Sequence, residues 1–179
     1  VLNFLIVTGQ LGRVYFTLPD PEESDTYMPG EFQGMEEDKK YVSLRLGTAR
    51  RPSIKTRMKG SKPIIDVSVF LEGDILSIDG DQDYSTGEGL TELEQFVSDY
   101  MKRNVTEFLI KTRDEFKSDI CATGRPLKKT FLLWDDWIAF KWMDKYPKAE
   151  FNVDVKVLVR RSGVMTNQVP LSHMKGKDK

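Results

Sequence analysis

Cysteine and histidine are nearly absent from this chain of 179 residues, which contains one of each, Cys121 and His173. A single cysteine excludes an internal disulfide and a metal site built from several thiolates. A single histidine in the polar C-terminal stretch excludes the usual Ser-His-Asp and Cys-His arrangements, because both need a histidine base fixed beside the nucleophile. We therefore expect no histidine chemistry, and we expect Cys121 to be a small packed residue.

The chain also lacks an excess of charge of either sign, and it lacks long apolar runs. Its 27 basic and 28 acidic residues leave a net charge of -1, which argues against a nucleic-acid partner. No apolar stretch reaches the ~20 residues needed to cross a bilayer, and the first residues have neither a basic leader nor a cleavage site. Because the chain begins with Val1 rather than Met, we expect a piece of a longer protein.

Cofactor and metal motifs are incomplete. Asp79, Asp81 and Asp83 imitate the opening of an EF-hand loop. Tyr84 then occupies the position that needs glycine, and Leu90 occupies the position that needs a bidentate glutamate. No glycine pattern matches a phosphate-binding loop. We expect no cofactor and no metal, with weak adventitious cation binding by the acidic turn as the alternative.

Alternation of apolar and polar residues predicts strands on both sides of a long central segment. The first half contains four such stretches, around Val14–Leu18, Val42–Leu46, Ile54–Met58 and Ile65–Leu71. The shorter apolar run Leu2–Val7 predicts a further strand. The clearest strand is Phe151–Val159, where Leu158 is the only apolar residue on the polar face. One apolar and one polar face per strand is typical of antiparallel pairing.

Helical periodicity occupies the centre of the chain. Thr91 and Glu94 have the spacing of a capping box, which predicts a helix from there to about Ala122. Its apolar stripe is predicted to comprise Leu93, Val97, Met101, Val105, Phe108, Leu109, Thr112, Phe116 and Ile120.

A second helix is predicted from Pro126 to Pro147, with Trp134, Ile138 and Trp142 on one face. The fold class is therefore predicted to be α+β: a mainly antiparallel sheet with a long helix and shorter helices packed on one face. We expect one domain over residues 1–179, with a mobile loop at 19–40 and a disordered tail at 168–179.

Two groups of side chains are candidates for contact with a partner. Lys55, Arg57 and Lys59 share one face of a strand, which suits an anionic membrane surface or an acidic partner, although a solvated face is the plainer interpretation. Trp134 and Trp142 are predicted to pack in the core. Trp137 and Phe140 point to other faces of the helix and are candidates for an exposed contact.

A carboxylate-based hydrolase is a third interpretation, because Asp135 and Asp136 supply two acids. Adjacent residues on a helix point about 100° apart, so a charged outer helix face explains the pair more simply.

Several motifs occur together in a defined order. Lys117–Ile120 closes the long helix, Gly124 follows it, and Trp134 and Trp142 precede Tyr146-Pro147. The valine-alternating strand ends in Arg160-Arg161-Ser162-Gly163, and FTLPDPE (16–22) and KPIIDVSVFLEGDILSI (62–78) stand upstream. Together they resemble the C-terminal domain of the Ger(x)C family, the C subunits of bacterial spore germinant receptors.

The resemblance implies a non-catalytic extracytoplasmic subunit of a nutrient germinant receptor, acting in spore germination through contacts with membrane-embedded A and B subunits. It also implies a location at the outer face of the spore inner membrane, with a lipid anchor on an upstream segment absent from this chain. Nothing in the sequence decides whether the domain contacts a small-molecule germinant. Lys117–Ile120, Gly124, Trp134 and Trp142 carry over as fold determinants only.

Overall fold

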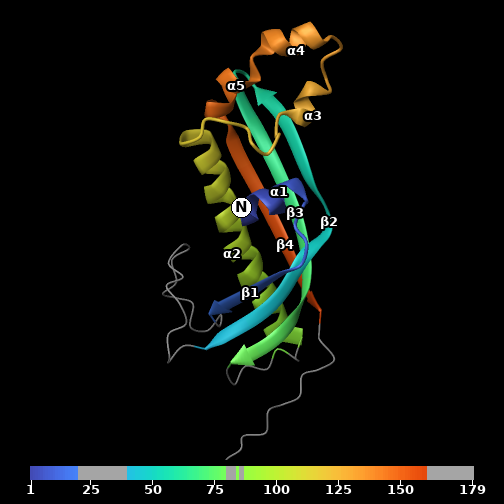
Figure 1. Cartoon of the computed structure of the whole chain (residues 1–179), viewed down its shortest axis with the longest axis vertical. Coiled ribbons are helices and arrows are strands. Elements are labelled where there is room, and N and C mark those ends of the chain that lie inside the picture. The colour runs from blue at the N-terminus through green and yellow to red at the C-terminus, as the bar shows by residue number, and fades with distance from the viewer. Residues whose placement is uncertain (20–39, 80–83, 85–86, 161–179) are drawn as a thin grey trace, which may run out of the picture.

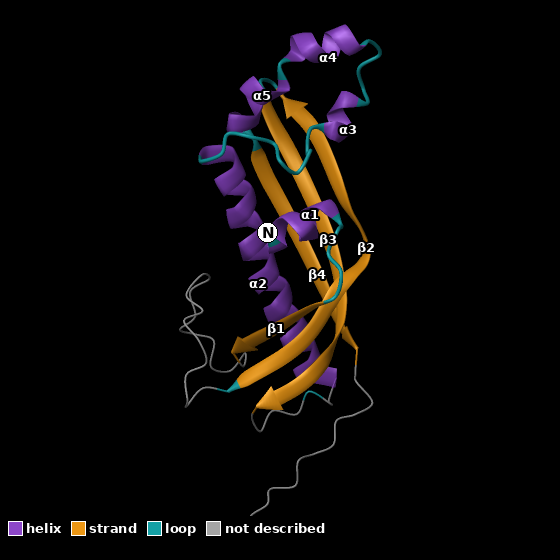
Figure 2. Ribbon diagram, in the orientation of Figure 1, coloured by secondary structure: helices purple, strands orange, loops and turns teal. Residues whose placement is uncertain are grey.

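One four-stranded sheet organises the protein, whose structure is a computed structural model describing residues 1–19, 40–79, 84 and 87–160 (Figures 1 and 2). The strands follow the order β1-β2-β3-β4, with β1 at Val14–Pro19, β2 at Tyr41–Lys59, β3 at Lys62–Asp79 and β4 at Glu150–Arg160. The first three are antiparallel to their neighbours, whereas β4 runs parallel to β3. The predicted α+β class with a mainly antiparallel sheet is confirmed.

β2 is one long, bent strand where the sequence predicted two. Its register against β3 shifts between Thr48 and Arg50 and again between Arg50 and Ser53, so extra residues bulge from the ladder and bend the strand. Pro52 lies in the second irregularity, where its missing N–H costs no ladder hydrogen bond. The strand predictions for 42–46 and 54–58 were therefore correct. The bulges between them interrupt the alternation, so the sequence did not show that the two stretches form one strand.

The N-terminal residues form a helix, α1 (Leu2–Thr8), so the strand predicted for Leu2–Val7 was wrong. A six-residue apolar run does not separate a buried strand from a short buried helix. Gly9 ends α1 in the left-handed region, with φ 71°, a conformation that glycine adopts without steric cost. Asn3 then ties α1 to the long helix, because its Nδ2 donates to the carbonyl of Asn104 at 3.1 Å.

The long helix α2 spans Gly87–Asp114 rather than 91–122. Thr91 is not its cap, since the Thr91 hydroxyl donates to the carbonyl of Gly87 inside the helix. The helix ends early because Lys117, with φ 48°, turns the chain aside. The predicted stripe is buried as far as Thr112, apart from the half-buried Phe108, whereas Phe116 and Ile120 beyond the end are 51% and 42% exposed.

The tryptophan-containing segment is broken into short pieces instead of one helix from Pro126 to Pro147. These are α3 (Arg125–Lys128), α4 (Trp134–Phe140), α5 (Trp142–Lys145) and the 3-10 turn η2 (Tyr146–Lys148). Lys141 separates α4 from α5 with φ 50°. This left-handed residue rotates Trp142 away from the face that carries Trp134 and Ile138. α4 consequently projects at one end of the molecule's long axis (Figure 1).

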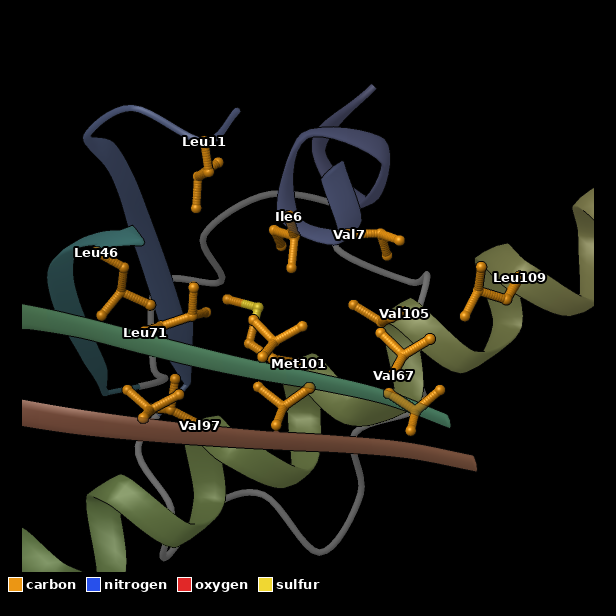
Figure 3. Packing of buried hydrophobic residues seen from close by; sticks show 14 of the residues in the cluster. Ile6, Val7, Leu11, Leu46, Val67, Leu71, Val97, Met101, Val105 and Leu109 are labelled. Atoms are coloured by element: carbon orange, nitrogen blue, oxygen red, sulfur yellow. The ribbon is translucent and has the colours of Figure 1, made fainter. Parts of the chain in front are cut away.

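The core lies between the sheet and the two helices α1 and α2. Ile6 and Val7 of α1 point toward Met101 and Val105 of α2, above Val67 of β3 (Figure 3). All five side chains are at most 2% exposed. Full burial of each such side chain contributes about 1.5–3 kcal/mol of hydrophobic free energy, so helix and sheet hold each other in place.

The outer edge of β4 is covered by side chains of α2. The Val159 N–H donates to Glu94 Oε1 at 2.8 Å, and the Val157 N–H donates to Ser98 Oγ at 3.0 Å. Glu94 was predicted to complete a capping box at the start of the helix. It instead accepts a hydrogen bond from the edge of β4. This arrangement blocks two donors that an open edge would offer to another chain.

The predicted loop at 19–40 and tail at 168–179 fall outside the described residues, except at Pro19 and Lys40. Asp81, Asp83 and His173 also lie outside them.

Candidate functional site

Asp119, in the turn after α2, accepts four hydrogen bonds. Its Oδ1 accepts from the backbone N–H and the hydroxyl of Thr123, both at 2.8 Å. Its Oδ2 accepts from the Gly124 N–H at 2.8 Å and from the indole Nε1–H of Trp142 at 2.9 Å. Hydrogen bonds to a charged group contribute about 1.5–3 kcal/mol each in favourable settings. Asp119 therefore fastens the turn to α5.

Gly124 is required by the close approach of Trp142. A Cβ added at Gly124 would lie 2.5 Å from both Cε2 and Nε1 of the indole, far inside van der Waals contact. Gly124 has φ -74°, so the requirement comes from space and not from backbone conformation. Three residues predicted as fold determinants, Asp119, Gly124 and Trp142, thus form one contact cluster.

Tyr146 and Thr112 form a buried polar pair behind Trp142. The Thr112 hydroxyl donates to the carbonyl of Leu109 at 2.7 Å, which leaves the Tyr146 hydroxyl to donate to Thr112 Oγ1 at 2.7 Å. Burial raises the pKa of Tyr146 to about 12 and raises the pKa of Cys121 to about 12. Both groups are therefore neutral near pH 7. Cys121 is packed, as predicted.

Lys55, Arg57 and Lys59 are exposed on alternate positions near the C-terminal end of β2. Arg57 forms an ion pair with Asp66. A hydrogen bond from Asn152, followed by that of Arg57, lowers the pKa of Asp66. The charge of Arg57 is thereby partly balanced, and Lys55 and Lys59 flank it. The alternation predicted this shared face correctly, and its role as a contact stays a prediction.

The predicted contact residues Trp137 and Phe140 belong to an aromatic stack at the base of α4. Both are half-buried and pack against the core. Their ring centroids lie 5.9 Å apart, and Trp137 lies 6.3 Å from Trp142. Phe131 contacts both, at 5.6 and 5.1 Å. Each keeps some exposed surface, so a contact role for Trp137 and Phe140 remains a prediction.

Trp134 was predicted to pack in the core, and that prediction was wrong. Its side chain is 59% exposed, whereas Trp142 is buried as predicted. The residues beside Trp134 are also apolar and exposed: Leu132 at 98%, Leu133 at 64% and Ile138 at 56%. We call these four residues the apolar tip. Sequence reasoning missed it because one helix face was predicted to carry Trp134, Ile138 and Trp142 together, and the exposed Leu132 and Leu133 were not considered.

The two carboxylates considered as an acid–base pair, Asp135 and Asp136, are adjacent on α4. Asp135 and Asp136 are exposed in the first turn of α4. The described carboxyl groups with a clear pKa shift, Asp66, Asp114 and Glu150, all have it lowered by hydrogen-bonding partners. A general acid needs the opposite shift. The described residues also contain no group of three or more potential metal ligands.

A polar hollow lies beside the bend of the sheet, lined by residues that include Arg13, Gly47 and Gly73. Four of its charged side chains are paired with one another: Arg45 with Asp74 at 2.6 Å and Arg160 with Glu72 at 2.7 Å. This pairing explains those four charges without a ligand. Within the described ranges, no helix has the length and apolar composition needed to span a membrane.

Comparison with known proteins identifies the fold and the family. A family model described as spore germination B3/GerAC like, C-terminal, matches residues 2–163. No curated protein matches the chain. A solved structure described as the crystal structure of the GerBC protein is similar, with a TM-score of 0.63 and 15% identity over 88% of this chain. The match covers 43% of that protein, so this chain spans less than half of its length.

At this low identity, the likeness to the GerBC protein shows a shared fold. The family model carries the assignment further, because it extends from α1 to just past β4 and therefore includes every described element. The resemblance found in the sequence motifs is confirmed. The chain belongs to the spore germination B3/GerAC-like C-terminal family, that of the germinant receptor C subunits involved in spore germination.

Proposed function

We propose that this domain is a non-catalytic, extracytoplasmic part of a nutrient germinant receptor and acts by contact with the membrane-embedded A and B subunits. The observation that carries the proposal is the family match over residues 2–163. Attachment to the outer face of the spore inner membrane through a lipid on an upstream segment is part of the same proposal.

Capture of partner subunits tests the proposal. The chain is immobilised and incubated with detergent-solubilised spore inner membrane, and bound A and B subunits are identified by mass spectrometry. We expect either subunit to be retained by the chain and not by the bare support. Retention of neither subunit, with a folded bait, would contradict the proposed contact.

Charge reversal then tests the predicted basic contact. The triple variant Lys55→Glu, Arg57→Glu, Lys59→Glu is expected to lose capture of the subunits. The control Lys102→Glu, Arg103→Glu, Lys111→Glu makes the same charge change at exposed positions of α2 and should retain it. If the two triple variants capture the subunits equally well, the contact does not involve the basic strand.

A membrane surface or an acidic partner remains the second candidate for these residues, favoured by the exposure of Lys55 and Lys59. Binding of the chain to anionic vesicles that is lost in the first triple variant and kept in the second would support it. A carboxylate-based hydrolase is not proposed, because Asp135 and Asp136 are both exposed in the first turn of α4.

A further inference from the structure

The apolar tip is exposed at the end of the molecule where α4 projects (Figure 1). Leu132 and Leu133 lie in the connection between α3 and α4, and Trp134 and Ile138 are one turn apart on α4. Their exposed fractions range from 56% to 98%. Scattered apolar residues are normal on a surface, but a cluster of large ones at one protruding point marks an interaction site.

The tip rests on packed aromatic side chains. Phe131 packs against Trp137 and Phe140, and Trp137 stacks near Trp142. Trp142 is in turn held by Asp119. The aromatic side chains beneath the tip are therefore half-buried or, for Trp142, buried, and they support the exposed apolar side chains above them.

Positive charge predominates in the segment that carries the tip. Residues 125–148 contain six basic and three acidic side chains, a net charge of +3, whereas the whole chain carries -1. Lys128 Nζ lies 4.1 Å from the ring centroid of Trp134, and Lys145 Nζ lies 4.9 Å from that of Phe140. β2, which carries Lys55 and Lys59, joins the base of this region through the Thr56 hydroxyl, which donates to the Thr123 carbonyl at 2.5 Å.

Two acids limit how deeply the tip can enter an apolar phase. Asp135 and Asp136 lie about 100° and about 200° around α4 from Trp134, away from the face that Trp134 shares with Ile138. The arrangement is therefore an apolar apex with charged flanks. Tryptophan, leucine and lysine at such an apex suit a membrane interface, where the apolar parts enter the acyl boundary and the ammonium groups stay among the headgroups.

We propose that the apolar tip inserts into the interfacial layer of an anionic phospholipid bilayer, with Lys128, Lys129 and Lys145 facing the lipid phosphates. The shape favours a bilayer over a folded partner, because a small convex point at the end of the long axis meets a planar surface without needing a matching groove. The inference goes beyond the subunit contacts proposed above and does not depend on them.

The three tryptophans make the test direct, because they all lie between residues 134 and 142. The full chain is mixed with vesicles of phosphatidylglycerol and phosphatidylcholine, or of phosphatidylcholine alone, and sedimented. We expect binding to the anionic vesicles, a blue shift of tryptophan emission, and quenching by lipids brominated on their acyl chains. The Trp134→Phe variant should lose most of that quenching, since Trp137 and Trp142 are more deeply packed.

The decisive variant is Leu132→Ser with Leu133→Ser. Both side chains are exposed, so the fold should be kept, and partitioning should fall by at least about tenfold because two insertable side chains are lost. Leu76→Ser with Leu158→Ser is the matched control, since these leucines are 49% and 39% exposed on the sheet. Changing Lys128 or Lys129 to Gln should cost about fivefold each on anionic vesicles.

Three results would overturn the proposal. The first is no binding of the original chain to anionic vesicles. The second is equal binding by the tip variant and its control, which would mean electrostatic adsorption elsewhere. The third is a tip variant that loses capture of the A or B subunit although the original chain does not bind vesicles, which would make the tip a protein contact. Failure of subunit capture alone leaves the vesicle result standing, so the two proposals fail separately.

Discussion

Trp142 donates its indole N–H to the carboxylate of Asp119 at 2.9 Å, across 23 residues of sequence. The same carboxylate holds the backbone N–H groups of Thr123 and Gly124. The turn after α2 and the helix that precedes β4 are thereby joined by one side chain, and α4 with its apolar tip extends from this junction.

Replacing Asp119 by Ala should lower the free energy of unfolding by about 3 kcal/mol, because four donors lose a charged acceptor in a partly buried place. Asp119→Asn should cost less, since one amide oxygen still accepts. Urea unfolding followed by tryptophan fluorescence measures both. Asp154→Ala, on the exposed face of β4, is the control and should change stability by at most about 0.5 kcal/mol. Equal effects at both positions would contradict the role of Asp119.

Gly124→Ala should destabilise the fold by about 1–3 kcal/mol, because the new methyl group would overlap the Trp142 ring. Gly12→Ala is the matched control, since a Cβ there meets nothing within 4 Å. A double-mutant cycle with Trp142→Phe isolates the contact, because a smaller ring relieves the overlap. Additive effects in that cycle would show that the cost of Gly124→Ala lies elsewhere.

Stability should decline at alkaline pH. Burial raises the pKa of Tyr146 from 10.0 to about 12 and that of Cys121 from 9.0 to about 12. The folded state thus keeps protons that the unfolded state loses, so their stabilising contribution is complete below about pH 9 and disappears by about pH 12. Urea midpoints measured across this range should fall.

The Tyr146→Phe and Cys121→Ala variants should each show a shallower fall over that alkaline range, even though each is less stable at neutral pH. An unchanged slope in both variants would assign the alkaline loss to other groups.

Glu94→Ala should weaken the covered edge of β4. Removing the acceptor for the Val159 N–H should cost about 1–2 kcal/mol and speed hydrogen exchange at that amide. It should also increase self-association at high concentration, because an edge donor becomes available. Glu92→Ala, at an exposed position of α2, should leave exchange and association unchanged. The edge role is wrong if Val159 exchange is the same in both variants.

Regular periods made much of this fold predictable from sequence. The valines of β4 and most of the apolar stripe of α2 are buried, as their spacing predicted. Both patterns were readable because each repeats several times along its element. Short segments were harder. Leu2–Val7 has too few residues to distinguish a strand from a helix. Gly9 ends α1, but a glycine at this position would also suit a turn between two strands.

The candidate site was less predictable because it depends on contacts distant in sequence. Lys141 takes a left-handed conformation that no propensity favours, and the burial of Trp142 against Gly124 and Asp119 holds the chain there. A helical period carried through Lys141 put Trp134 in the core, whereas the break leaves it outside. Lys55, Arg57 and Lys59 were placed correctly because strand alternation is local, but the ion pair of Arg57 with Asp66 required the β2–β3 register.

The parallel pairing of β3 with β4 also sets the order in which the protein can be completed. Asp66 and Asn152 meet across the sheet although 86 residues separate them, and β4 supplies buried valines that cover α2. During synthesis, the sheet therefore lacks its fourth strand until Arg160 has emerged. Until then β3 has an apolar, unpaired edge. The sheet is therefore completed late, and the nascent chain is vulnerable to aggregation during that time. Synthesis that pauses before Glu150 would prolong that interval.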